Sequence, residues 1–386
     1  MSERFRRILV VKLRDLGDLV LTTPALAALR EAQPNARIDL LAQPVAAELV
    51  RGSGLVDEHL RVPRAALEAA ARRGPSGWIF LAALTGALRR RGYDACVLLE
   101  HLITRPGVTK YAALTLASGA PRRFGLDNGR GWFLTDRVRD DGFSARPEAA
   151  HWLSVVGLLG ADTRARPARI PTAPADERHA EELLAGLARP LVALHPGSGG
   201  YAPARRWPLE RFERVGVELA RRGLGLVVVG NEADLNGRLA CATGARDLTR
   251  RTTVRQLAAV LARVDLLVTN DSGVMHVGAA AGARIVALFG QTDPRAWGPY
   301  YGVPSGQGRA VVVELPLPCR PCLYRGHELG WRHGCATREC LELLSVGRVL
   351  AACEQQLARS ASGSPPRGRP GRRRQPAPAG RSDAGP

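Results

Sequence analysis

The chain has 386 residues, of which 45% are hydrophobic, and it carries a formal net charge of +19. This length suits two domains of ordinary size, and the composition excludes coiled-coil and collagen-like proteins. No apolar run reaches the roughly eighteen residues of a membrane-spanning helix, and the run after the basic N-terminus is too short for a signal peptide, so we expect a cytoplasmic protein. Seven cysteines in such a protein argue against a disulfide framework.

Arginine supplies nearly all of the positive charge, because Lys12 and Lys110 are the only lysines. A basic surface suits an anionic partner such as nucleic acid, anionic lipid or a phosphorylated glycan. Genome composition can also enrich arginine, so the charge alone selects none of these partners. The segment 360–386 is dominated by Pro, Gly, Arg and Ser, which predicts a disordered basic tail.

The first half of the chain opens with Ile8–Val11, an apolar run typical of a buried parallel strand. A loop, Arg14–Asp18, is expected next, and then a helix through about Arg30. Pro24 either kinks this helix or follows a cap at Thr23 that starts a new one. The remaining assignments are strands over 38–42 and 95–99, helices over 64–73 and 78–91, and a loop or strand edge at 122–125.

The second half alternates strands and helices more clearly. Thr253 and Gln256 form a capping box, and Pro208 and Gly223 delimit a helix. The predicted order is strand 191–194, helix 208–222, strand 226–229, helix 253–262, strand 265–269, helix 273–281 and strand 285–289. We therefore predict an α/β protein with two Rossmann-like doubly wound domains, 1–165 and 181–355. A linker is expected at about 166–180, where the Pro-, Ala-, Thr- and Arg-rich stretch 163–177 lies.

Ligands of open α/β sheets bind beyond the carboxyl ends of the strands, so the loops after strands are candidate sites. Asp18 follows the first strand. Its carboxylate could accept a proton from an attacking hydroxyl, or it could only cap the next helix. The spacing leaves both interpretations open.

A second candidate is the small-residue loop that starts at His195 and includes Gly197 and Ser198, with Arg205 shortly after it. Small residues let backbone N–H groups approach an anion, and arginine adds charge. An ordinary glycine-rich loop is the alternative. The chain lacks a Gly-x-Gly-x-x-Gly after any predicted strand and a Gly-Lys-Ser/Thr, which argues against nicotinamide and P-loop enzymes.

A third candidate is the strand-to-helix junction at residues 270–276, whose helix N-terminus could stabilise a diphosphate without metal. Plain capping by Asp271 or Ser272 is the alternative, although it leaves His276 without a role. Glu232, after another strand, could bind ribose hydroxyls or could simply be solvated. No Asp-x-Asp triplet, the usual metal-chelating carboxylate pattern of sugar transferases, occurs in the sequence.

In this order, these loops resemble glycosyltransferase family 9, the bacterial ADP-heptose:lipopolysaccharide heptosyltransferases. The resemblance extends from about residue 8 to about residue 350. The matching stretches are ILVVKLRDLGDLVLTTPALAALR (8–30), VALHPGSGGYAPARRWPLERF (192–212), and 257–299 with LLVTNDSGVMHVGAAAG and LFGQTDPRAWGP.

The resemblance implies a GT-B architecture, an N-terminal domain for the lipid acceptor, a C-terminal domain for the donor, and inverting transfer without metal or other cofactor. It assigns the catalytic base to Asp18 and the contact with the donor diphosphate to Arg205, where relatives often have Lys. It assigns the ribose carboxylate to Glu232. The pyrophosphate loop corresponds to Asp271, Ser272 (often Thr in relatives), Gly273 and His276.

For the acceptor, the resemblance implies a lipid-linked inner-core glycan with phosphates and acidic sugars. Gly17 and Arg14, and a basic face including 122–123, are the residues we expect near it. Such an enzyme would work at the inner membrane as a peripheral protein and would bind no specific nucleic acid.

Two alternatives remain on sequence grounds: a transferase of another nucleotide-activated sugar to a different cell-surface glycan, and a non-enzymatic module whose tail grips RNA or membrane. The late cysteines add a weak zinc possibility, because the first two have ligand spacing while the second gap is wider than usual. The four are Cys319, Cys322, Cys335 and Cys340. Otherwise, no metal site is expected.

Overall fold

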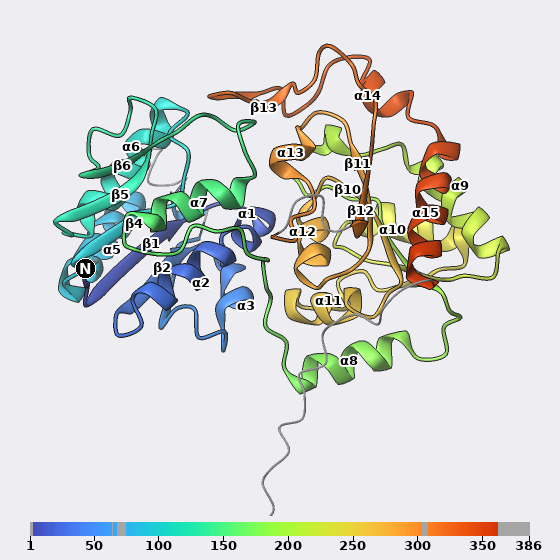
Figure 1. The fold of residues 1–386 in the computed structure, drawn as a ribbon, viewed down its shortest axis with the longest axis horizontal. Helices are drawn as coiled ribbons and strands as arrows, with labels where there is room; N and C mark the ends of the chain where they lie inside the picture. Colours follow the sequence, from blue (N-terminus) through green and yellow to red (C-terminus); the bar gives the residue numbers. More distant parts are fainter. Residues whose placement is uncertain (1–2, 64, 68–74, 303–307, 362–386) are drawn as a thin grey trace, which may run out of the picture.

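The computed structural model describes residues 3–63, 65–67, 75–302 and 308–361. Two six-stranded parallel sheets form its two halves, which lie side by side in Figure 1, so the predicted fold class is confirmed. The helix predicted over 64–73 and the tail predicted over 360–386 fall mainly outside the described residues. None of the described helices combines the length and the apolar composition that a membrane crossing requires.

The N-terminal sheet has the strand order β3-β2-β1-β4-β5-β6, the 3-2-1-4-5-6 order of a doubly wound fold. Its strands are β1 (Arg7–Lys12), β2 (Arg37–Ala42), β3 (Glu58–Arg61), β4 (Ala95–Leu98), β5 (Arg122–Asp127) and β6 (Asp136–Arg139). Its helices are α1 (Leu16–Val20), α2 (Thr23–Ala32), α3 (Ala46–Val50), α5 (Pro75–Arg91), α6 (Arg105–Ala117) and α7 (Glu148–Gly157).

Strand β1 shows why this sheet is apolar on both faces. Ile8 and Val10 pack in the core under α2 and α7, whereas Leu9 and Val11 pack in a second core under α5 and α6. A strand covered on both faces reads as a continuous apolar run, as the sequence indicated.

The C-terminal sheet has the corresponding order β12-β11-β10-β7-β8-β9. Its strands are β7 (Leu191–His195), β8 (Gly225–Val228), β9 (Arg246–Asp247), β10 (Leu266–Asn270), β11 (Ile285–Phe289) and β12 (Ala310–Glu314). Its helices are α8 (Pro174–Leu184), α9 (Leu209–Arg221), α10 (Ala233–Thr243), α11 (Val254–Leu261), α12 (Gly273–Ala280), α13 (Pro294–Trp297), α14 (Glu339–Glu342) and α15 (Val346–Ala361), with a 3-10 turn, η1 (Pro203–Arg205).

The structure corrects three local predictions. The expected loop after β1 is mostly the short helix α1, which contains Asp18, and α2 restarts with Thr22, not Thr23, as its N-cap. Helix α8 begins at Pro174, inside the stretch expected to be a linker, because Asp176 accepts a hydrogen bond from the backbone N–H of residue 173 and stabilises the first turn.

Two features join the halves. Helices α1 and α12 pack end to end, and a side chain at Gly17 would come within 2.8 Å of the His276 ring, so only glycine permits this approach. In addition, a two-stranded hairpin of the C-terminal half, β13 (Leu323–Arg325) and β14 (Glu328–Gly330), reaches over the N-terminal half in Figure 1. Gly326 in its turn accepts a hydrogen bond from the backbone N–H of Phe143.

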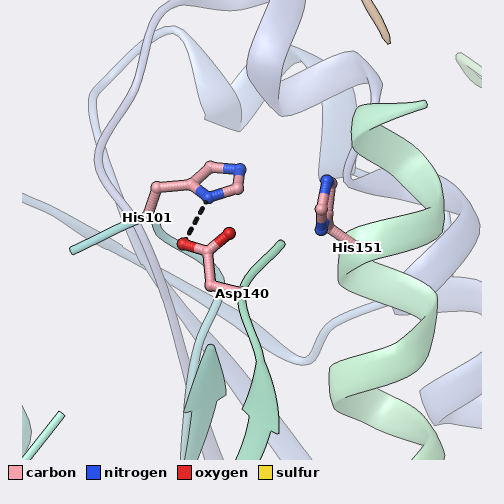
Figure 2. Close-up of side chains that lie close together, drawn as sticks. All are labelled: His101, Asp140 and His151. Atoms are coloured by element: carbon pink, nitrogen blue, oxygen red, sulfur yellow. Dashed lines mark hydrogen bonds and ion pairs between the residues drawn. The ribbon is translucent and has the colours of Figure 1, made fainter. Parts of the chain in front are cut away.

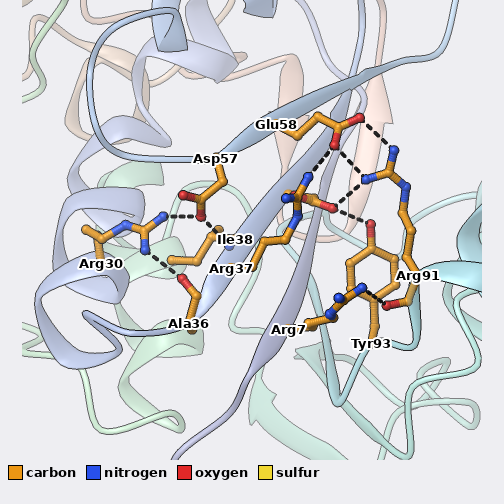
Figure 3. Close-up of polar contacts among 10 residues, drawn as sticks. Arg7, Arg30, Ala36, Arg37, Ile38, Asp57, Glu58, Arg91 and Tyr93 are labelled. Carbon is orange, nitrogen blue, oxygen red and sulfur yellow. Dashed lines mark hydrogen bonds and ion pairs between the residues drawn. The ribbon is translucent and has the colours of Figure 1, made fainter.

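The amino-terminal edge of the N-terminal sheet carries a polar cluster, shown in Figure 3. Glu58 at the start of β3 pairs with Arg37 and with Arg91 at 2.5 and 2.6 Å. Asp39 accepts hydrogen bonds from Arg91 and from the Tyr93 hydroxyl. This cluster lies at the opposite end of the strands from the candidate site.

Candidate functional site

Asp18 lies near the start of α1, just beyond the carboxyl end of β1. The N-cap position of α1 is Asp15, so the capping interpretation of Asp18 is wrong. Its partly buried carboxylate has no hydrogen bond from any of the described residues. Burial raises the pKa of Asp18 to about 6; Lys12 and Arg14 oppose the rise, and two nearby carboxylates add to it. The group is therefore an ionised base at neutral pH with a pKa suited to taking a proton.

Asp18 is surrounded by three charged residues. Arg14 was predicted as a site residue, whereas Lys12 and Glu100 were not. The Lys12 ammonium donates to the Leu99 carbonyl at 2.9 Å and lies 3.9 Å from the centre of the Trp152 ring. Arg14 pairs with Glu100 at 2.9 Å, and the pKa of Glu100 is about 2, because these two cations outweigh the effect of burial. Glu100 lies two residues beyond the end of strand β4, so the rule that loops after strands carry chemistry applied to it.

A buried histidine with two carboxylate partners lies behind this group, as Figure 2 shows for one of them. The His101 ring contacts Asp140 at 2.9 Å through Nδ1 and Glu148 at 3.2 Å through Nε2. Although burial lowers it, Glu148 and Asp140 raise the pKa of His101 to about 9. His101 is therefore an imidazolium that donates one hydrogen bond to each carboxylate.

The site is completed by aromatic residues from both halves of the chain. One pocket is lined by Lys12, Arg14, Asp18, Glu100, His101, Phe143, Glu148, Trp152, Trp297 and Tyr324. Trp297 ends α13, and Tyr324 is in β13, so the C-terminal half closes the pocket over α1. Tyr324 comes from a hairpin that the sequence interpretation did not assign.

The glycine-rich loop after β7 is held against the loop after β8. Glu232 accepts a hydrogen bond from the backbone N–H of Gly199 at 2.9 Å, and a side chain at Gly197 would collide with the Glu232 carboxylate. Ser198 donates to the carbonyl of residue 202. His195 is buried and donates to the Val229 carbonyl, and burial lowers its pKa, so it is neutral. These residues shape the loop, and Glu232 is only partly exposed.

Arg205 joins this loop to the start of α12. Its guanidinium lies 3.2 Å from Asp271 and donates to the Ser198 carbonyl, while Thr292 donates to the same Asp271 carboxylate at 2.6 Å. Burial lowers the pKa of Arg205, but Asp271 and other negative groups, Asp18 among them, raise it above its ordinary value. A fixed positive charge thus lies close to Asp18, although the two come from opposite halves.

The N-terminus of α12 faces the same space. Ser272 is the N-cap and accepts a hydrogen bond from the Met275 N–H, so the capping interpretation of Ser272 is confirmed and that of Asp271 is wrong. The first N–H groups of a helix, here from Gly273 on, have no partner within the helix. Burial lowers the pKa of His276 to about 4, and its Nδ1 has no partner among the described residues. A neutral, unpaired imidazole beside an anion cradle is available to a ligand.

The four late cysteines line one cavity, together with residues that include Gln291 and Arg338. Cys335 accepts a hydrogen bond from the Arg338 N–H at 3.3 Å, and Cys340 is buried. Within the described part of the chain, only His101, Asp140 and His151 bring three metal-ligating atoms within 4.8 Å of one another. The cysteine sulfurs are therefore more widely spread than zinc ligands, and the zinc site stays a prediction.

Chemically, the arrangement presents one unpaired carboxylate base opposite a cation and a helix N-terminus. A group transfer fits it in which a hydroxyl loses its proton to Asp18 while an anionic leaving group is received by Arg205 and α12. Gly273 and His276 lie against Gly17, the neighbour of Asp18, and Asp18 is among the charges that raise the pKa of Arg205, so these predicted residues lie near one another. Gly17 lies at the contact between α1 and α12, and Arg14 lines the pocket.

A sequence model described as glycosyltransferase family 9 (heptosyltransferase) matches residues 81–331. Lipopolysaccharide heptosyltransferase 2 of Salmonella typhimurium is 26% identical over 307 residues, which cover 75% of this chain and 84% of that protein. The structure of Escherichia coli ADP-heptose lps heptosyltransferase II superposes with a TM-score of 0.68 at 20% identity, over 92% of this chain and 100% of that one. The fold is therefore GT-B.

The E. coli glycosyltransferase TibC, described as iron-containing and dodecameric, shares the fold with a TM-score of 0.56 at 15% identity, over 94% of this chain and 78% of that one. We therefore asked whether the trio in Figure 2 fits a metal ion. The three ligand atoms lie within 4.8 Å of one another, but both ring nitrogens of His101 are also within hydrogen-bond distance of a carboxylate, of Asp140 at 2.9 Å and of Glu148 at 3.2 Å. An ion bound to His101 would have to displace one of these contacts.

Proposed function

The chain belongs to glycosyltransferase family 9, and from this membership we propose that it transfers heptose from ADP-heptose to the lipopolysaccharide inner core. The observation that carries the proposal is the carboxylate of Asp18, which has no hydrogen-bond partner among the described residues and lies near Arg205 and the start of α12. We assign the acceptor to the N-terminal half (1–165) and the donor to the C-terminal half (181–355). The heptose-transferring relatives favour this assignment over another sugar.

In the proposed reaction, the acceptor hydroxyl gives its proton to Asp18 as its oxygen attacks the anomeric carbon. The bond from that carbon to the ADP oxygen breaks on the opposite face, which inverts the configuration. Arg205 and the N–H groups at the start of α12 stabilise the negative charge that grows on the departing phosphate. Preorganised donors of this kind provide their largest benefit in the transition state.

The proposal needs no divalent metal, because Arg205, although its guanidinium also pairs with Asp271, and a helix N-terminus would together offset the charge of the diphosphate. Glu232, in the loop between β8 and α10, is the residue we assign to the ribose hydroxyls. His195, Gly197 and Ser198 shape the loop that would lie along the nucleotide. Neutral His276 would form a hydrogen bond with the nucleotide sugar without adding charge to the site.

Contact with the inner membrane follows from a lipid-linked acceptor and is part of the proposal. The basic patch at 122–123 is a weaker candidate than expected for that contact. Arg122 pairs with Asp136, and Arg123 donates to the carbonyls of Phe133 and Ala120. Arg14 is also committed, to Glu100, so its role toward the acceptor would be indirect.

The test incubates the purified full chain with ADP-heptose and lipopolysaccharide from a strain whose core ends before the first or the second heptose. We expect mass spectrometry to show one added heptose, with acceptor-dependent release of ADP that EDTA leaves unchanged. UDP- and GDP-sugars are tested in parallel. Release from one of these, with none from ADP-heptose, would replace heptose by another sugar; no transfer from any donor would overturn the proposal.

A further inference from the structure

Glu148 is a buried carboxylate of the pocket that the proposed mechanism does not use. It is the first residue of α7, and its side chain is 1% exposed. Oε1 accepts a hydrogen bond from His101, while Oε2 has no partner among the described residues. Although burial raises it, His101 lowers the pKa of Glu148 below its ordinary value, so the group is ionised.

A position at the start of a helix explains a carboxylate only in part. The helix dipole stabilises an acidic residue there, but most such residues keep their oxygens in water. A buried carboxylate oxygen without a donor is costly, and such an atom in a folded protein calls for an explanation. The other two cations of the pocket do not supply one: Lys12 donates to Leu99 and Arg14 donates to Glu100, and neither donates to Oε2.

The surroundings of this oxygen point to the ligand that would complete it. Glu148 lines the same pocket as Asp18, and its charge raises the pKa of Asp18, so the two carboxylates are neighbours. Aromatic rings of Phe143, Trp152 and Trp297 form apolar walls beside them. Lys12, Arg14 and His101 also line the pocket, but each already donates a hydrogen bond within the chain, whereas Glu148 Oε2 has no partner among the described residues. A free hydrogen-bond acceptor beside apolar walls suits a hydroxyl group of a sugar.

We propose that Glu148 is an acceptor-binding residue whose Oε2 accepts a hydrogen bond from a second hydroxyl of the acceptor sugar, beside the hydroxyl that Asp18 deprotonates. The inference rests on the proposed function and adds a specificity element to it. The acceptor presents a pair of neighbouring hydroxyls to the pocket, and its anionic groups point away. His101 lies behind Glu148 and holds its Oε1, which leaves Oε2 toward the pocket.

Asp140 provides a matched control. It is a buried carboxylate on the other nitrogen of the same imidazolium, but it does not line the pocket. In Glu148→Gln, the imidazolium holds the amide oxygen at Oε1, so an NH2 group replaces the acceptor Oε2. In Asp140→Asn, an amide oxygen still accepts from His101, and the NH2 group replaces the oxygen that accepts from the Gly142 N–H, which lies outside the pocket lining.

The experiment measures calorimetric binding of detergent-solubilised lipopolysaccharide from a strain whose core ends before the first or the second heptose, together with transfer kinetics. For Glu148→Gln, we expect an acceptor Kd and KM raised about 10-fold or more, the usual loss for one charge-assisted hydrogen bond. The donor KM should stay within about 2-fold. Asp140→Asn should leave both acceptor constants within about 2-fold of the unmodified protein.

Equal effects of the two substitutions would make the cluster structural only and would overturn the inference, as would an unchanged acceptor Kd in Glu148→Gln. If Glu148→Gln does not fold, Glu148→Asp serves instead. It keeps the negative charge beside His101, but its shorter side chain moves the free oxygen away from the pocket, so the same rise in the acceptor Kd and KM is expected. The binding measurement also separates two failures. An unmodified chain that binds but does not transfer contradicts the proposed function, while the Glu148 comparison still gives its own result.

Discussion

The amino-terminal and carboxyl-terminal edges of the N-terminal sheet, which lie at the two ends of its strands, use the same residue types in different roles. At the amino-terminal edge, Glu58 and Asp39 each meet arginine, and the carboxylate oxygens of Glu58 are both paired. At the carboxyl-terminal edge, Asp18 has no hydrogen bond from the described residues, and Glu148 has one free oxygen. The first edge is satisfied by its own chain, whereas the second is left for a ligand to complete.

Burial sharpens this difference. Glu58 is 37% exposed and surrounded by arginines, and its pKa lies below the ordinary value, chiefly because Arg91 donates to it. Asp18 shows the opposite shift, because burial outweighs two nearby cations. A satisfied carboxylate stabilises the fold, and an unsatisfied one costs stability in return for reactivity. Substitutions at the two edges should therefore separate activity from stability.

The largest effect is expected at Asp18. Asp18→Ala removes the proposed base, and kcat should fall by about 10²- to 10⁴-fold, the usual contribution of a general base. The donor KM should change by less than about 3-fold, because the donor lies on the other half. Steady-state kinetics with ADP-heptose and truncated lipopolysaccharide provide the measurement. An Asp18→Ala variant of full activity would end the assignment of the base.

The next effect concerns Arg205, the proposed contact with the donor diphosphate. Arg205→Ala should lower kcat by about 10²- to 10³-fold, as expected for one preorganised donor to a growing negative charge. Arg205→Lys restores the charge but not the two-pronged geometry and should recover only part of the loss. The ratio of the two variants measures how much of the contribution is charge alone. Equal activity of Lys, Ala and Arg at this position would contradict the diphosphate contact.

The pKa of Asp18 also predicts a pH profile. Above pH 6 the carboxylate is ionised and active, so kcat/KM should be level; below pH 6 it should fall about tenfold per pH unit. Glu148→Gln removes a negative neighbour and should move this limb to lower pH, while Asp140→Asn should move it less. If the pH at which kcat/KM falls is unchanged in Glu148→Gln, the charge of Glu148 does not affect the pKa of Asp18, and this prediction is wrong.

A stability measurement tests the same carboxylate, because its ionisation should lower the stability of the fold while it raises activity. A folded-state pKa above the unfolded value means that stability is lost as pH rises from about 4 to about 6, and stays lower above. Asp18→Asn removes this penalty. Its thermal midpoint should therefore exceed that of the unmodified chain at pH 8, and the difference should vanish near pH 4. A midpoint that falls at pH 8 would mean that Asp18 is satisfied after all.

The sequence predicted the features that depend on local pattern. The apolar run Ile8–Val11 and the capping box at Thr253 indicated a strand and a helix start that the structure confirms. The position of Asp18 beyond a strand end follows from the same pattern, although the first three residues of α1 lie in the stretch predicted as a loop.

What the sequence did not predict depends on contacts between distant segments. Glu148 meets His101 across 47 positions, and Tyr324 reaches the pocket on a hairpin from the other half. Lys12 reads as the end of an apolar strand, and only the three-dimensional packing against Trp152 shows that its charge is buried in the site. Spacing along the chain carries no signal for such meetings, whereas the rule of strand ends did apply to Glu100.

The smallest effect is expected at the satisfied edge, and it tests the other side of the comparison. Glu58→Gln weakens the pairs with Arg37 and Arg91, which are partly exposed, so the free energy of unfolding should fall by only about 1 kcal/mol or less. Because the folded-state pKa of Glu58 is lowered, this contribution is present above the unfolded pKa and is lost as the pH falls below it. Denaturant titrations at pH 7 and pH 3 should show the difference shrinking at the lower pH, while Glu182→Gln, at a side chain that is 77% exposed, should change neither curve.

The same variant also tests whether the two edges are independent. Heptosyl transfer by Glu58→Gln should match that of the unmodified chain, because Glu58 lies at the opposite end of the strands from the pocket. A loss of transfer without a loss of stability would show that the two edges are coupled through the sheet.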